Sequence, residues 1–93
     1  MQTAELLIRN PTGLHARPAA LFVKTASGFR SKITVENVTR GTTPANAKSI
    51  LTLLASGVSR GHLIRVTAEG EDEEGAIAAL RELVESGAGE PLE

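Results

Sequence analysis

The chain lacks cysteine, tryptophan and tyrosine, and it contains phenylalanine at only two of its 93 positions. Without cysteine it can form no disulfide, no thiolate metal site and no cysteine nucleophile, so hydrophobic packing must hold the fold together. This composition is compatible with a reducing cytoplasm, where we expect the protein to act. The two aromatic side chains offer little surface on which bases could stack, and we therefore expect no nucleic-acid partner.

Long apolar runs are also absent. The longest, such as residues 19–23, fall far short of the roughly 20 residues that span a bilayer, and Glu5 and Arg9 interrupt the N-terminal stretch. We therefore expect neither membrane insertion nor a signal peptide.

The length of the chain and its hydrophobic content of 41% predict one domain around one core. We assign this domain to residues 1–87 and expect a monomer. Residues 88–93 are predicted to form a polar tail that frays. The sequence leaves open whether Leu92 and Glu93 are native or appended residues.

The charges are segregated along the chain although the net charge is only −1. Residues 1–65 hold nine Lys and Arg against two acids, a balance of +7, whereas residues 66–93 hold nine acids against Arg81, a balance of −8. A basic first two-thirds suits an acidic protein surface or a nucleic acid. The shortage of aromatic residues favours the protein surface.

Hydrophobic periodicity predicts an α+β fold. Alternating apolar residues predict three half-buried strands, at residues 3–9, 31–38 and 62–68. A turn over residues 40–44 leads into a further short strand or extended segment. Apolar residues at helical spacing predict helices at residues 16–27, 47–56 and 72–86. The order β-α-β-β-α-β-α indicates a small antiparallel sheet with helices gathered on one face.

Single residues mark the ends of two predicted helices. Gly28 is expected to stop the first helix. Asn46 is expected to cap the start of the second helix, and Gly57 is expected to end it. The apolar face of this second helix is unusually wide for its length, and we place Leu53 in the core.

His15 lies between a glycine-containing turn and the first turn of the predicted helix at residues 16–27. A helix start presents unpaired N–H groups and the positive end of the helix dipole, which together favour an anion. Ala16 and Arg17 would supply these donors, because Pro18 has no N–H. A neutral imidazole is a nucleophile, and a guanidinium suits a phosphate. We therefore predict that His15 accepts a phosphoryl group that Ala16 and Arg17 help to hold.

The context of His15 carries this prediction, because an arbitrary histidine near a helix start more often packs or bonds locally. His62 opens a predicted strand without such a context, and we assign it no chemistry. Two histidines without cysteine make a poor ligand set, so we expect neither a metal nor a cofactor. No combination of nucleophile, base and acid typical of a catalytic triad is evident.

The run from Gly13 to Ala19 resembles the active-site signature of the HPr family, the histidine-containing phosphocarriers of the sugar phosphotransferase system. Residues 46–50 resemble the second-helix motif of the family, and residues 68–74 resemble its entry to the last helix. The resemblance implies an open-faced β-sandwich of four antiparallel strands with three helices on one face. It also implies that enzyme I, loaded from phosphoenolpyruvate, phosphorylates His15 at Nδ1.

The group would then pass to an enzyme IIA-type acceptor in sugar uptake, with Arg17 steadying it. Such a phosphocarrier is covalently modified but performs no independent turnover. The resemblance further implies a docking patch for both partners, with a basic rim: Ala20, Lys24, Lys48, Ile50, Leu51 and Leu54. Ordinary core positions for the leucines, and ordinary solvated charges for the lysines, stay open as alternatives.

Ser49 occupies the position that a dedicated kinase phosphorylates in many Gram-positive members of the family. The alternative is an ordinary serine in the first turn of a helix, where a phosphate would also be electrostatically favourable. We therefore keep regulatory phosphorylation of Ser49 as a secondary prediction.

Two departures from the family pattern bear on the acceptor. The loop at residues 39–44 is longer than the usual hairpin of stand-alone members, and Ser56 stands where an apolar residue is common. The longer loop is similar to that of HPr-like domains in multidomain phosphotransferases, such as the phosphocarrier subunit of dihydroxyacetone kinases, which is the main alternative. A third possibility is a regulatory protein-binding module, although the presence of His15 argues against that as the sole role.

Overall fold

The computed structural model describes residues 1–91, and its elements follow the order predicted from the sequence. They are β1 (Gln2–Leu7), α1 (Ala16–Ser27), β2 (Lys32–Asn37), β3 (Ala45–Asn46), α2 (Ile50–Ala55), β4 (Leu63–Glu69) and α3 (Glu73–Glu85). The strands form one antiparallel sheet in the spatial order β1-β4-β2-β3. Residues 92–93, the end of the predicted tail, lie outside the described residues.

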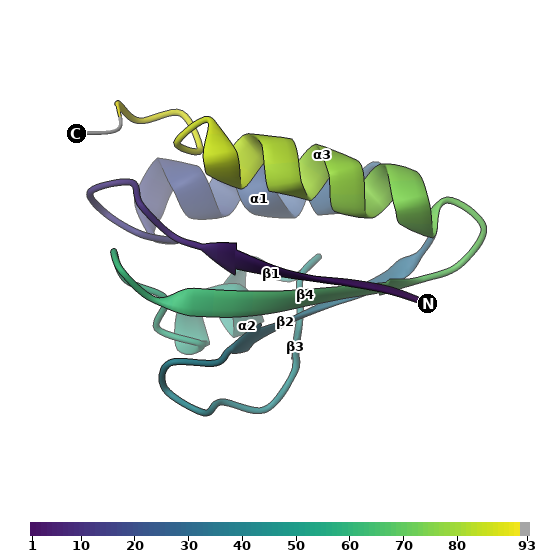
Figure 1. Cartoon of the computed structure of the whole chain (residues 1–93), viewed down its shortest axis with the longest axis horizontal. Helices are drawn as coiled ribbons and strands as arrows, with labels where there is room; N and C mark the ends of the chain where they lie inside the picture. Colours follow the sequence, from purple (N-terminus) through teal and green to yellow (C-terminus); the bar gives the residue numbers. More distant parts are fainter. Residues whose placement is uncertain (92–93) are drawn as a thin grey trace.

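The three helices pack on one face of the sheet. Alternate strand residues point into the core and are buried: Ala4, Leu6, Ile33, Val35, Ile64, Val66 and Ala68. Phe22 of α1, Leu53 of α2 and Leu80 of α3 are fully buried in the same cluster. Figure 1 shows α1 and α3 lying side by side along the sheet. The predicted open-faced sandwich and the predicted core position of Leu53 are confirmed.

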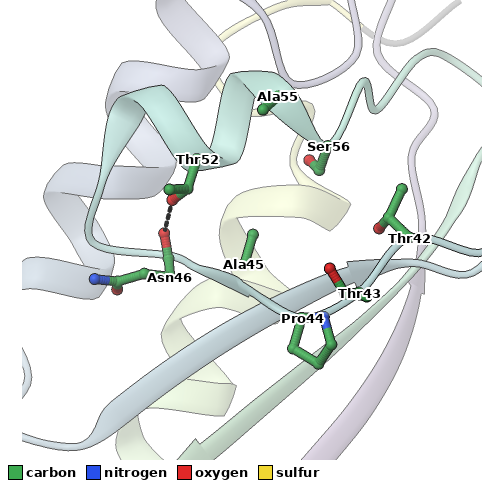
Figure 2. Close-up of a pocket in the computed structure, with 8 residues that line it drawn as sticks. All are labelled: Thr42, Thr43, Pro44, Ala45, Asn46, Thr52, Ala55 and Ser56. Carbon is green, nitrogen blue, oxygen red and sulfur yellow. Dashed lines mark hydrogen bonds between the residues drawn. The ribbon is translucent and has the colours of Figure 1, made fainter.

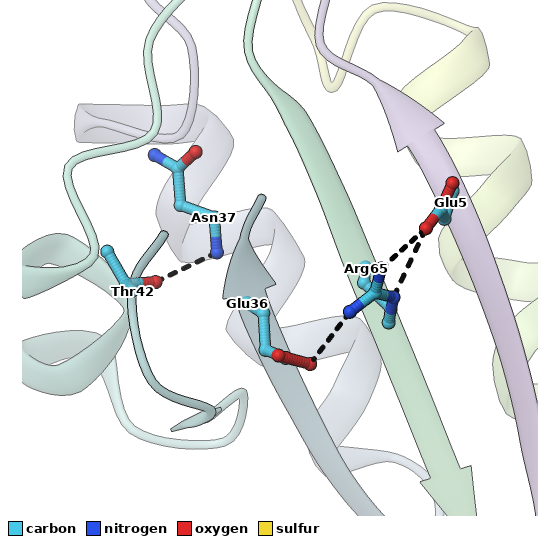
Figure 3. A network of polar contacts seen from close by, with 5 residues as sticks. All are labelled: Glu5, Glu36, Asn37, Thr42 and Arg65. Atoms are coloured by element: carbon cyan, nitrogen blue, oxygen red, sulfur yellow. Dashed lines mark hydrogen bonds and ion pairs between the residues drawn. The ribbon is translucent and has the colours of Figure 1, made fainter. Parts of the chain in front are cut away.

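The opposite face of the sheet is polar and centres on Arg65 of β4. Glu5 and Glu36 lie directly opposite Arg65 on the two neighbouring strands, and Figure 3 shows the guanidinium between them. Arg65 Nη2 lies 2.8 Å from Glu5 Oε2, and Nη1 lies 3.6 Å from Glu36 Oε2. The hydrogen bonds to Glu5 raise the pKa of Arg65 above its ordinary value. A one-residue slip would turn these charges into the core, so the triad helps to fix the register.

The connection between β2 and β3 is an ordered turn. The Thr42 hydroxyl accepts from the Asn37 N–H at 2.9 Å (Figure 3), and the Thr42 N–H donates to the Asn37 carbonyl at 3.1 Å. A shallow pocket of about 300 Å³ lies between this connection and α2 (Figure 2). Among the described residues, the pocket is lined by residues 42–46 with Thr52, Ala55 and Ser56, and none of these is a predicted site residue.

The predicted cap of the second helix is wrong, because α2 begins after Ser49 instead of after Asn46. Ser49 is the N-cap, and its hydroxyl accepts from the Thr52 N–H at 3.5 Å. Asn46 pairs with Thr34 of β2 and therefore belongs to the sheet. Its carbonyl oxygen accepts from the Thr52 hydroxyl at 2.7 Å (Figure 2), while its side chain accepts from the Lys48 N–H at 2.9 Å.

The expected fraying after residue 87 is wrong as far as Glu90. Ala88 is fully buried, and its N–H donates to the Leu83 carbonyl at 2.8 Å. The Glu90 side chain is bound to the loop between β1 and α1. The polar composition of the segment did not indicate this, because the partners lie at the other end of the chain.

Candidate functional site

His15 is the N-cap residue of α1, with an extended backbone at φ −128° and ψ 163°. Its carbonyl oxygen accepts the first helical bond from the Ala19 N–H at 3.5 Å. The imidazole is half-buried and makes no capping hydrogen bond within the described chain. The helix start therefore fixes the backbone of His15 without using its ring.

The helix start next to His15 is suited to an anion. Ala16 has a φ of 51°, in the left-handed region that costs a residue with a Cβ about 1 kcal/mol, so the chain turns sharply directly after His15. Helix geometry leaves the N–H groups of Ala16 and Arg17 without intrahelical acceptors, and Pro18 has none to satisfy. These donors and the positive helix end favour negative charge at this position.

The two residues before His15 are fixed against the loop between α2 and β4. A Cβ on Gly13, whose φ is +67°, would lie 2.4 Å from the Val58 carbonyl oxygen and 2.7 Å from the Ser59 Cα. The Leu14 N–H donates to the same carbonyl at 3.0 Å, and the Leu14 side chain is fully buried. The position of His15 thus depends on how this loop is held.

His62 supports that loop. Its Nδ1 accepts from the Ser59 N–H at 3.1 Å and lies 3.1 Å from Asn37 Nδ2. Asn37 is fully buried, and its amide also donates to the Ser56 carbonyl at 3.1 Å. No sequence pattern indicated this role of His62, because it requires the end of β2, the end of α2 and the loop to meet.

Arg17 is exposed in the first turn of α1. Its Nε lies 3.6 Å from the position that a Cβ on Gly89 would occupy, so the guanidinium group lies near residue 89. The proximity of Arg17 to His15 follows from the sequence, whereas its proximity to residue 89 does not.

The residues predicted for docking differ in how free they are. Leu51 is 77% exposed, Ile50 39% and Leu54 37%, and α2 packs against α1, where Ala20 and Lys24 are exposed. These residues can therefore contribute to a surface on the two helices. Their docking role stays a prediction.

Lys48 and Ser49 are already engaged in local contacts. The Lys48 ammonium donates to the Phe29 carbonyl at 2.6 Å and is half-buried. The Ser49 hydroxyl caps α2. Lys48 is thus a less available rim charge than Lys24, and the regulatory phosphorylation of Ser49 stays a prediction.

Two further findings concern residues 1–91. They contain no group of three or more histidine, cysteine or acidic side chains placed to hold a metal ion. None of their helices combines the length and the apolar character that crossing a membrane would require.

Comparisons with known proteins agree with this geometry. The family model of the PTS HPr component phosphorylation site matches residues 2–86. A multiphosphoryl transfer protein of Salmonella typhimurium is 44% identical over 88 residues, which are 95% of this chain and 23% of that protein. This chain therefore spans less than a quarter of that relative.

Two other relatives are covered over most of their length. Phosphocarrier protein HPr of Xylella fastidiosa is 44% identical over 82 residues, 88% of this chain and 89% of that protein. A crystal structure of HPr-C-His from Thermoanaerobacter tengcongensis has a TM-score of 0.92 and 52% identity, covering 99% of this chain and 100% of that one.

Proposed function

This chain belongs to the HPr family, and we propose that it is a phosphocarrier of the phosphoenolpyruvate-dependent sugar phosphotransferase system. In this proposal His15 accepts a phosphoryl group from phosphorylated enzyme I and passes it to an enzyme IIA-type acceptor in the cytoplasm. The observation that carries the proposal is the placement of His15, a half-buried N-cap whose ring is not used for capping within residues 1–91.

The transfer uses the lone pair on Nδ1 of the neutral imidazole of His15. Nδ1 attacks the phosphorus, a P–N bond forms, and the bond between phosphorus and the donor group of enzyme I breaks. The electron pair of that bond leaves with the donor. The ring proton stays on Nε2 of His15, so this step requires no proton transfer from the chain. In the second transfer, His15 is the leaving group and the acceptor is the nucleophile.

The start of α1 supplies the electrostatics for the loaded state. The phosphoryl oxygens bring negative charge to a position where the Ala16 and Arg17 N–H groups lack helical acceptors. The Arg17 guanidinium adds a positive charge with a geometry that suits phosphate. The chain itself therefore binds and steadies the group, while the partners supply and remove it.

Both partners would dock on the surface formed by α1 and α2. The exposure of Leu51, Ile50 and Leu54 supports this, because large apolar side chains are rarely grouped on a surface without a partner. Lys24 would contribute a basic rim for acidic partners. We give Lys48 a smaller share, because its ammonium already binds the Phe29 carbonyl.

A second candidate is the same phosphocarrier chemistry within a multidomain phosphotransferase, as in the phosphocarrier subunit of dihydroxyacetone kinases. It is favoured by the match to less than a quarter of the Salmonella typhimurium protein. The two candidates share His15 and differ in the acceptor. Offering the phosphorylated chain to enzyme IIA and to a dihydroxyacetone kinase separately would distinguish them by which one gains the group.

Incubation with enzyme I and phosphoenolpyruvate, followed by intact-mass measurement, tests the proposal. We expect one phosphoryl group, lost in acid, on the wild type and on His62→Asn, and none on His15→Ala. His62→Asn is the matched control for the number of phosphoryl groups at the end point, and not for the rate, because it leaves His15 as the sole histidine and keeps a hydrogen-bond acceptor near Ser59. Absence of modification on the wild type, or equal modification of His15→Ala, would refute the proposal.

A further inference from the structure

The segment after α3 returns to the loop that precedes His15. This segment, residues 87–90, lies beyond the part of the chain that the family model matches. Its backbone is held by the hydrogen bond from the Ala88 N–H to the Leu83 carbonyl and by one of 2.9 Å from the Glu90 N–H to the Gly87 carbonyl. Figure 1 shows the segment and the β1–α1 loop at the same end of the molecule.

Three donors of the loop converge on one oxygen of Glu90. Oε1 accepts from Asn10 Nδ2 at 2.9 Å, from the Thr12 N–H at 3.1 Å and from the Thr12 hydroxyl at 2.9 Å. The hydrogen bond from Asn10, followed by those from Thr12, lowers the pKa of the Glu90 carboxyl below its ordinary value. Glu90 is therefore ionised at neutral pH and forms charge-assisted hydrogen bonds.

The Asn10 side chain links Glu90 to Gly13 by hydrogen bonds. The Asn10 side chain is only 1% exposed, and its amide donates to the Gly13 carbonyl at 2.8 Å as well as to Glu90. These two acceptors fix the orientation of the amide. The loop that ends two residues before His15 is thus joined to the C-terminal segment through a buried side chain.

The same segment contacts α1 on the other side of His15. A Cβ on Gly89 would lie 2.8 Å from Leu21 Cδ1 and 3.6 Å from Arg17 Nε. The φ of Gly89 is +86°, which a residue with a Cβ rarely adopts. Glycine therefore permits the close approach of the segment to Leu21, and Arg17 Nε lies nearby at an ordinary van der Waals distance.

We propose that residues 87–90 form a C-terminal clasp in which Glu90 holds residues 10–13 and Gly89 lets the segment pack against Leu21 of α1, so that the loop and the start of the helix are correctly placed around His15. Glu90 is then a positioning residue for phosphoryl transfer. This inference rests on the proposed phosphocarrier function. The physical reason is that removal of Glu90 takes an acceptor from the amide of the buried Asn10 side chain and leaves the exposed Thr12 N–H to solvent, which loosens the loop. Small displacements of a reacting group slow a transfer strongly.

The variants Glu90→Ala and Glu90→Gln test the clasp in the full chain, with enzyme I and phosphoenolpyruvate as the phosphoryl donors. With this chain as the substrate of enzyme I, we expect Glu90→Ala to lower the kcat of enzyme I about fivefold. The KM of enzyme I for the chain should stay unchanged, because the docking surface lies on α1 and α2. Glu90→Gln retains the oxygen on which the donors converge and should recover most of kcat. Glu85→Ala removes the same charge from an exposed position in the last turn of α3 and should leave both constants unchanged.

Two results would overturn the clasp. One is an unchanged kcat in Glu90→Ala. The other is an equal increase of kcat in Glu90→Ala and Glu90→Gln, because it would mean that the Glu90 charge repels the phosphoryl group.

A second pair of measurements keeps the clasp separate from the proposed function. Amide hydrogen exchange of Thr12 and Gly13 in the unphosphorylated protein should be faster in Glu90→Ala than in Glu85→Ala. Equal exchange would refute the clasp even if no phosphoryl group is ever accepted. For the α1 side of the clasp, we expect Gly89→Ala, whose Cβ would meet Leu21, to shorten the lifetime of phosphorylated His15 at least twofold, and an unchanged lifetime would remove Gly89 from the clasp.

Discussion

Gly13 and Gly41 have nearly the same backbone angle, with φ of +67° and +69°, but their surroundings differ. A Cβ on Gly13 would meet the backbone of Val58 and Ser59, whereas one on Gly41 would meet no atom of the described residues within 4 Å. The two positions therefore separate the cost of the backbone angle from the cost of a clash.

Gly13→Ala is expected to lower the free energy of unfolding by about 3 kcal/mol, because it adds overpacking against fixed backbone to the cost of the angle. Gly41→Ala is expected to cost about 1 kcal/mol, the angle alone. Urea unfolding monitored by circular dichroism measures both values. Equal losses would mean that the β1–α1 loop can move away from the Val58 carbonyl.

Arg17→Ala is expected to slow phosphoryl transfer to His15 about tenfold or more, because a charge-assisted contact to the phosphoryl oxygens is lost. The fold should persist, since the Arg17 side chain is exposed. Arg17→Lys keeps the charge but lacks the planar guanidinium, so its transfer rate should lie between those of the wild type and Arg17→Ala. Stopped-flow transfer from phosphorylated enzyme I provides the rates, and a wild-type rate in Arg17→Ala would remove the residue from the site.

At the scale of elements, α2 is a helix of six residues that buries Leu53 and exposes its other leucines. A Glu at Leu51 should therefore leave the core intact but place a charge in the proposed docking surface. We expect Leu51→Glu to raise the KM of enzyme I for this chain about tenfold, which is the effect typical of losing a central apolar contact in an interface. Leu7→Glu is the control, because Leu7 is 53% exposed on β1. Equal effects of the two substitutions would contradict a local docking role.

The helices show which features of the fold the sequence could predict. The bounds of α1 agree with the prediction, because apolar spacing and Gly28 mark the same segment. The start of α2 does not, because Asn46 and Ser49 are both good capping residues and the choice depends on pairing with β2. A local sequence pattern does not show the pairing of Asn46 with β2, which depends on residues far apart in the chain.

The candidate site divides in the same way. His15, Arg17 and the helix start are neighbours in the chain, so their juxtaposition could be predicted. The positive φ of Ala16 had no signal, because alanine does not favour that angle. The contact of Glu90 with Thr12 joins residues 78 positions apart, and only the fold brings them together.

At the scale of the whole molecule, Asp72 joins the start of α3 to the connection between α1 and β2. Its carboxylate accepts from the Arg30 N–H at 2.8 Å, from the Ser31 N–H at 2.9 Å and from the Ser31 hydroxyl. The hydrogen bond from the Ser31 hydroxyl is the main cause that lowers the pKa of Asp72 to about 2, from an ordinary 3.8.

The lowered pKa of Asp72 makes the stability of the domain depend on pH. Because the folded protein binds this proton less readily than the unfolded chain, the contribution is complete above about pH 4 and is lost as the pH falls towards about 2. Asp72→Asn should be less stable than the wild type at pH 7, and the difference should shrink over this range. Urea unfolding from pH 7 to pH 2.5 checks this, and a pH-independent difference would contradict it.

The position of β4 in the sheet also determines when the protein can fold during its synthesis. β4 pairs with β1 on one side and with β2 on the other, yet it follows both in the chain. Until residue 69 has left the ribosome, the two earlier parts of the sheet have no strand between them and expose their edges. Most of the strand pairing in this domain must therefore wait until β4 has been synthesised.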